Sequence, residues 1–144
     1  MPSDTFQHSG FTATDLSVVW AALDKPATWE TVPGVDRVYD PVIDESGRLQ
    51  GFMFESVAIG KTFIGRATPA ARVERATMAW DILTTELKGL TTVEIQSSGE
   101  GTQVAVRLDV KSVGVLASIF FPVIVSNIGD GFSSTVESFV AALG

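Results

Sequence analysis

The side chains that most often carry catalysis are sparse in this sequence, which contains a single histidine. His8 falls in a segment rich in Thr and Phe that is typical of a β-strand. A His–carboxylate pair or a nucleophile triad would have to use this residue, because no other imidazole is present. A partly exposed strand histidine is the simpler interpretation, and it is the one we favour.

Carboxylates are the other candidates, and Glu55, Glu74 and Asp81 fall in segments that we expect to be strands. A carboxyl group that faces an apolar cavity holds its proton more tightly than one in water, which suits general acid–base catalysis. For all three, an outward, solvated position is the simpler interpretation. Tyr39 and Arg66 could orient a ligand oxygen, although a surface position explains each of them as well.

The residue types needed for metal or nucleotide chemistry are missing. There is no cysteine, which excludes disulfides, thiolate metal sites and a cysteine nucleophile, and one histidine cannot supply a two-histidine site. No glycine-rich phosphate loop follows a strand and opens a helix, and Gly99-Glu100-Gly101 is better explained as a turn. We therefore expect neither a metal nor a cofactor.

The charge of the chain argues against nucleic-acid partners. The formal net charge is −7, and the ten basic residues are scattered singly between Lys25 and Lys111. Binding to phosphates, or to an anionic membrane surface, requires clustered Lys and Arg. The first residues lack the basic and then apolar pattern of a signal peptide, so we expect a cytoplasmic protein, although the absence of cysteine is also compatible with export.

Seven strands and two short helices are expected before residue 112. A helix capped by Thr14 or Asp15 and a short second helix around Trp29 follow the first strand. Turn signals separate the remaining segments, and no helix lies between them, which favours an antiparallel sheet. The expected strands cover residues 5–13, 35–43, 49–57, 61–68, 72–83, 89–97 and 102–111.

Alternation of apolar and polar residues indicates which strand faces are buried. In the last strand Val104, Val106, Leu108 and Val110 point inward. In the strand before the last hairpin, the expected inward set is Met78, Trp80 and Ile82. For residues 49–57 we choose Phe52 and Phe54 inward, whereas the opposite register would bring Met53 and Glu55 inside.

The last thirty or so residues read as a long helix whose first half is apolar all round. Residues 112–129 carry no charge, and Leu116, Phe120, Ile124 and Ile128 recur at every fourth position. A buried helix explains this uncharged run better than a membrane span, because it has no basic anchor on its far side. Pro122 should kink or break the helix, and Gly129 and Gly131 form a second weak point.

Several stretches resemble the START-like (SRPBCC) superfamily. Residues 19–26 with Trp29 and then Val32-Pro33-Gly34-Val35 resemble the opening of that family, and residues 60–66 resemble its central hairpin. Residues 99–104 are similar to the start of its last strand. Residues 113–117 are similar to the start of the last helix in the branch related to carbon monoxide dehydrogenase. The order of the elements agrees over nearly the whole chain.

The resemblance implies one α+β domain of residues 1–144, with a helix-grip fold in which a curved antiparallel sheet holds a long C-terminal helix. It also implies a cavity between sheet and helix for an apolar ligand. The candidate lining residues are Trp20, Phe52, Phe54, Phe63, Met78, Trp80, Val106, Leu116, Phe120 and Ile124. A filled aromatic core is the competing interpretation.

Three functions remain open at this point. The first is a non-catalytic carrier or sensor for a lipid or an aromatic metabolite. The second is a polyketide cyclase or dehydratase that uses an inward acid with Tyr39 or Arg66. The third is an accessory protein that acts through its apolar C-terminal helix, for which a homodimer or a peripheral membrane contact through Ile119–Val125 is the expected mode.

Overall fold

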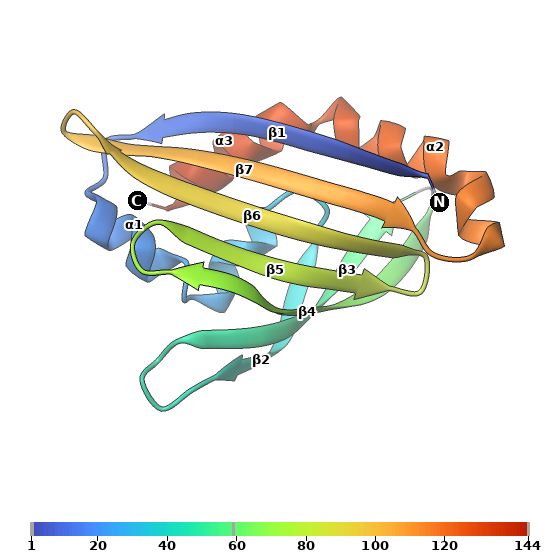
Figure 1. Cartoon of the computed structure of the whole chain (residues 1–144), viewed down its shortest axis with the longest axis horizontal. Helices are drawn as coiled ribbons and strands as arrows, with labels where there is room; N and C mark the ends of the chain where they lie inside the picture. Colours follow the sequence, from blue (N-terminus) through green and yellow to red (C-terminus); the bar gives the residue numbers. More distant parts are fainter. Residues whose placement is uncertain (1, 59, 144) are drawn as a thin grey trace.

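The molecule is built on one antiparallel sheet of seven strands. The computed structural model describes residues 2–58 and 60–143, and Figure 1 shows the helices along one face of the sheet. In space the strands follow the order β1-β7-β6-β5-β4-β3-β2, so the first strand pairs with the last. The strands are β1 (Ser3–Thr12), β2 (Arg37–Ile43), β3 (Leu49–Ala58), β4 (Lys61–Val73), β5 (Thr77–Thr84), β6 (Leu87–Ser98) and β7 (Gly101–Ser112).

The helices begin and end where the sequence signals indicate, with one exception. Asp15 caps α1 (Leu16–Ala22) by accepting a hydrogen bond from the Ser17 N–H, and the short 3-10 helix η1 (Pro26–Thr31) starts at a proline. The expected long C-terminal helix is two helices, α2 (Val115–Asp130) and α3 (Phe132–Ala142). The predicted α+β helix-grip architecture is thereby confirmed, with its long helix in two parts.

The break in the C-terminal helix falls at the glycine and not at the proline. Pro122 lies inside α2, whereas α2 and α3 meet at Gly131. No single helix within the described residues is long and apolar enough to cross a membrane. Only the pair Ala117–Asp130 and Phe132–Ala142 has the required length and composition together, and this pair is bent by 49°.

One strand boundary predicted from the sequence is wrong. The Pro69-Ala70-Ala71 segment was expected to end a strand, but β4 continues through it to Val73 with a register shift between Pro69 and Ala71. Proline has no N–H to donate, so it is accommodated at a bulge, where the ladder is interrupted anyway. The turn to β5 lies at Glu74–Ala76 and includes Arg75 with φ 58°. Arg72 therefore belongs to β4.

The predicted inward faces of β3 and β7 are confirmed. Phe52 and Phe54 are buried, and Met53 between them lies on the opposite face together with its cross-strand partner Arg66. The inward residues of β7 that the alternation indicated, Val104, Val106, Leu108 and Val110, are all buried.

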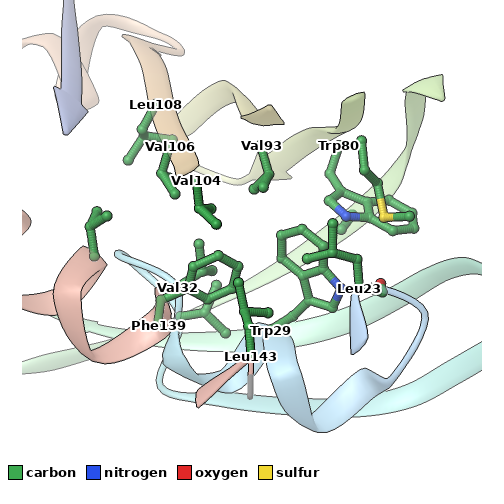
Figure 2. Close-up of a cluster of buried hydrophobic side chains, with 14 of the residues drawn as sticks. Leu23, Trp29, Val32, Trp80, Val93, Val104, Val106, Leu108, Phe139 and Leu143 are labelled. Atoms are coloured by element: carbon green, nitrogen blue, oxygen red, sulfur yellow. Dashed lines mark hydrogen bonds between the residues drawn. The ribbon is translucent and has the colours of Figure 1, made fainter. Parts of the chain in front are cut away.

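An aromatic cluster around Trp29 fills the concave face of the sheet beside α3. The ring centroid of Trp29 lies 5.8 Å from that of Trp80 and 5.7 Å from that of Phe139. The Trp29 indole N–H donates to the Leu23 carbonyl at 2.9 Å. Figure 2 shows this cluster, in which side chains from η1, β5 and α3 meet. Because these rings occupy this part of the concave face, open space is left only toward α2.

Candidate functional site

The candidate site is a pocket between the sheet and α2. It holds a cavity of about 70 Å³ under the inner face of α2, beyond the Trp29 cluster. Strands β3 to β7, α2 and the loop after η1 all contribute to its wall. The lining residues are Pro33, Gly34, Val35, Phe54, Ser56, Phe63, Ile82, Thr84, Glu86, Leu87, Gly89, Leu108, Val110, Ile124 and Ile128.

Two glycines shape the floor of this pocket. Gly65 lies directly opposite Phe54 across β3 and β4, and a Cβ on Gly65 would clash with the Phe54 ring. The ring therefore lies flat over the glycine instead of filling the pocket. Gly89 on β6 lies opposite Ile82 and itself lines the cavity without a side chain. The sequence thus keeps the floor low at two positions of a sheet whose other inward residues are large.

Glu86 is the ionisable residue of the lining, and it comes from the turn between β5 and β6. Its carboxylate lies 3.9 Å from the Lys61 ammonium and accepts a hydrogen bond from the Thr85 hydroxyl. The Thr84 hydroxyl accepts hydrogen bonds from the backbone N–H groups of Glu86 and Leu87, at 3.1 and 2.9 Å. Thr84 is therefore used to form the turn, and the polar contribution to the pocket is concentrated at Glu86 and Ser56.

A second hollow of about 190 Å³ adjoins the pocket. The segment Pro33–Val35, Ser56 and Ile128 line both spaces, while Asn127, Gly131 and Thr135 line only the second one. This groove runs between the loop after η1 and the junction of α2 and α3. A molecule in the pocket can thus extend into the groove past Ser56.

The structure brings three of the ten predicted lining residues into the pocket wall. Phe54, Phe63 and Ile124 line it. Of the other seven, Trp20, Phe52, Met78, Trp80 and Val106 are buried in the core outside the lining. The Leu116 side chain lies outside the described residues. Whether the three wall residues bind a ligand stays a prediction.

Phe120, the remaining residue of that set, is placed on the wrong side of the helix by the sequence pattern. Its side chain is 52% exposed, whereas Phe121 is 5% exposed and packs in the core. Steps of four residues rotate by about 40° around a helix, so Leu116, Phe120, Ile124 and Ile128 drift away from one face. Ala117, Phe121, Ile124 and Ile128 alternate steps of four and three and remain on it. The uncharged run is therefore buried on one face only.

The catalytic candidates of the second hypothesis do not meet in the pocket. Glu55 pairs with Arg37 at 3.1 Å, Glu74 accepts the Trp20 indole N–H in the turn before β5, and Asp81 is exposed. Tyr39 lies opposite Met53, on the outward face of the sheet with Arg66. The geometry therefore does not assemble an inward acid with Tyr39 or Arg66, and Glu86, which the sequence pattern did not single out, is the carboxylate at the pocket.

His8 connects the edge of the sheet to the last helix. Its Nε2 lies 2.7 Å from a Glu137 carboxylate oxygen, and the imidazole is 30% exposed. Both residues lie outside the pocket lining, so the predicted partly exposed strand histidine describes His8 well. Within residues 2–58 and 60–143, no three His, Asp or Glu side chains are grouped to hold a metal ion.

Comparison with known proteins identifies the fold. No protein-family model matches the sequence, and no curated protein matches it. Solved structures do match. A START superfamily protein from Mycobacterium smegmatis is 14% identical with a TM-score of 0.70, over 97% of this chain and 99% of the other. The Zhui aromatase/cyclase from Streptomyces sp. R1128 is 12% identical with a TM-score of 0.73, over 98% and 93%.

A third match is the Mll3558 protein from Rhizobium loti, which is 18% identical with a TM-score of 0.63, over 97% of this chain and 96% of the other. The three structures cover nearly the whole chain, and their identities are low. The chain therefore has the START-like (SRPBCC) helix-grip fold, as the sequence motifs predicted. A fold of this class is compatible with many functions, so the function has to be argued from the pocket itself.

Proposed function

We propose that the protein binds a neutral, apolar small molecule in the pocket between the sheet and α2. The observation that carries the proposal is the lining, which is apolar except for Ser56, Thr84 and Glu86. Burial of an apolar molecule against such a wall is favourable because it removes hydrocarbon surface from water on both sides. A carrier or sensor needs nothing more than this wall and an entrance.

The size of the pocket restricts the ligand. A cavity of about 70 Å³ is small beside the roughly 300–1,000 Å³ of most small-molecule pockets. It admits a unit of about one aromatic ring, or a short branched chain. A longer molecule would place its remainder in the adjoining groove of about 190 Å³. A polycyclic ligand would require α2 to move outward.

The first test is native mass spectrometry of the protein purified from its own host, followed by denaturing extraction of bound compounds. A co-purifying apolar compound at one equivalent supports the proposal. The purified protein is then titrated with the neutral fluorescent probe N-phenyl-1-naphthylamine. Neither a bound compound nor saturable probe binding would contradict the proposal.

Matched variants localise the binding. Ser56 lies at the passage between the pocket and the groove, so Ser56→Phe places a ring where a ligand would pass. Ile64→Phe adds a ring on the exposed outward face of β4 and is the control. We expect at least a tenfold loss of probe affinity in Ser56→Phe and none in Ile64→Phe. Equal affinities in both variants would place the probe elsewhere.

The exposed face of α2 favours a second candidate function, peripheral contact with a lipid bilayer. This apolar strip consists of Val115, Ile119, Phe120 and Val123, whose exposed fractions range from 48 to 80%. It lies in a run without charge, and the chain as a whole carries −7. A net negative protein is repelled by anionic lipid, so we propose a zwitterionic surface as the partner of the strip.

The membrane proposal is tested by flotation with phosphatidylcholine vesicles. Wild type should float with the vesicles, and the double variant Ile119→Ser, Phe120→Ser should not. The same double change on the exposed outward face, Ile64→Ser with Val73→Ser, is the control. Sedimentation of the protein alone as a dimer that the strip variant dissociates would instead assign the strip to a second copy of the chain.

A further inference from the structure

The sheet rung at the inner end of the pocket carries two polar side chains. The floor of the pocket includes Ile82 and its cross-strand partner Gly89. One step further inward, Trp80 on β5 pairs with Thr91 on β6, and Thr91 pairs with Leu108 on β7. Leu108 itself lines the pocket. The rung Trp80–Thr91–Leu108 therefore begins where the cavity ends.

Both polar groups on this rung are buried and have no partner. In the part of the chain that the structure describes, three buried side-chain polar atoms lack a hydrogen bond, and two of them are Trp80 Nε1 and Thr91 Oγ1. Each residue is 2% exposed. Nearly all buried polar atoms in folded proteins are hydrogen-bonded, because an unpaired one has lost its water without compensation. Two such atoms on directly opposite residues indicate that a third group completes them.

The floor next to this rung leaves room for such a group. Gly89 precedes Thr91 by two positions and faces the same side of β6. Because Gly89 has no side chain, the space above β6 between Ile82 and Val110 stays open toward Thr91. Figure 2 shows the Trp80 indole on the other side, among the buried side chains near Trp29. The pocket thus leads from its mouth at Glu86 to the polar rung.

We propose that the ligand of this pocket carries a neutral acceptor oxygen, such as a ketone or ester carbonyl, that Trp80 Nε1 and Thr91 Oγ1 receive. This inference rests on the proposed function. The indole N–H is a donor only and the threonine hydroxyl can donate, so both can point at one carbonyl oxygen. The lining contains Glu86 and no Lys or Arg, which disfavours a carboxylate ligand. The ligand class is therefore a small apolar carbonyl compound.

A pair of isosteric probes tests the inference. Acetophenone and α-methylstyrene have the same shape and differ in having C=O or C=CH2 beside the ring. Their dissociation constants are measured by displacement of N-phenyl-1-naphthylamine from wild type, Thr91→Val and Trp80→Phe. We expect each substitution to weaken acetophenone about 2- to 10-fold, the usual effect of one neutral hydrogen bond, and to leave α-methylstyrene unchanged.

The control is Thr92→Val, which removes a hydroxyl from the next residue of β6, on the other face of the sheet. It should change neither constant. If Thr91→Val and Trp80→Phe shift both probes equally, or shift neither, the polar rung does not receive the carbonyl and the inference is wrong, while the pocket stands. If neither probe displaces the dye from wild type, the proposed function fails as well. Thr91→Val is isosteric, so it decides the question even if Trp80→Phe does not fold.

Discussion

At the scale of single residues, the site depends on a contact between a glycine and an aromatic ring. A Cβ on Gly65 would overlap the far end of the Phe54 ring, closer than any real Cβ contact. The glycine thus determines where the Phe54 ring lies, and through it the height of the pocket floor. Its role is steric, because Gly65 is directly opposite Phe54 in the sheet.

We therefore predict that Gly65→Ala lowers the free energy of unfolding by about 1–3 kcal/mol, the usual cost of overpacking. Phe54→Leu removes the ring atoms that the new methyl would contact. The double variant should then be more stable than the sum of the single effects by at least about 0.5 kcal/mol. Chemical denaturation of the four proteins measures this coupling, and strict additivity would show that the ring does not rest on Gly65.

A second residue-scale feature holds α1 against the sheet. Asp24, just after α1, accepts two hydrogen bonds from the Arg72 guanidinium at 2.8 and 2.9 Å and one from the Leu49 N–H. The Arg72 guanidinium also lies over the Trp20 ring, 5.1 Å from its centroid. Burial opposes ionisation of Asp24, but the hydrogen bonds from Arg72 and Leu49 outweigh it and hold the pKa of Asp24 below its usual value.

A carboxyl group whose pKa is lowered by folding stabilises the protein above its unfolded pKa, near 3.9, and loses that contribution as the pH falls through the folded value. Asp24→Asn should therefore be less stable than wild type by about 1.5–3 kcal/mol at pH 7. The difference should shrink between pH 4 and pH 2. Glu100→Gln, in an exposed hairpin, should show no such trend, and a gap for Asp24→Asn that is independent of pH would contradict the account.

At the scale of elements, α2 has two faces with opposite functions. The inner face places Ile124 and Ile128 over the pocket, and the outer face presents the apolar strip to solvent. The two adjacent phenylalanines report this division. Phe121→Ala should cost about 3–5 kcal/mol of stability, because it empties a buried site. Phe120→Ala should cost less than about 0.5 kcal/mol. Thermal and chemical unfolding of the pair measure both values, and equal costs would mean that α2 is rotated.

The sequence predicts the elements better than it predicts their rotation. Alternation in β7 identifies the buried face because a strand has only two faces. In α2 almost every residue is apolar, so composition does not distinguish Phe120 from Phe121, and only the sheet beneath decides. The turn after β4 was misplaced for a similar reason, because Pro69 can end a strand or sit in a bulge.

At the scale of the whole molecule, the pocket arises from segments far apart in the chain. Pro33, Phe54, Glu86, Leu108 and Ile124 meet only after the sheet has closed over the helix. The helix-grip resemblance therefore predicted that a cavity exists, while its residues remained largely unknown. The strand pattern already placed Leu108 and Val110 inward. Glu86 follows no periodic pattern, because it belongs to a turn.

The central claim is that the cavity under α2 receives the ligand, and isoleucine methyl groups report on it directly. Ile82, Ile124 and Ile128 line the pocket, whereas Ile43, Ile64 and Ile119 are exposed elsewhere. The decisive measurement is a methyl NMR spectrum of isoleucine-labelled protein during titration with acetophenone. Saturable shifts of the three pocket methyls, with the exposed ones unchanged, are the predicted result. Shifts confined to Ile119, or no saturable shift at all, would contradict the account.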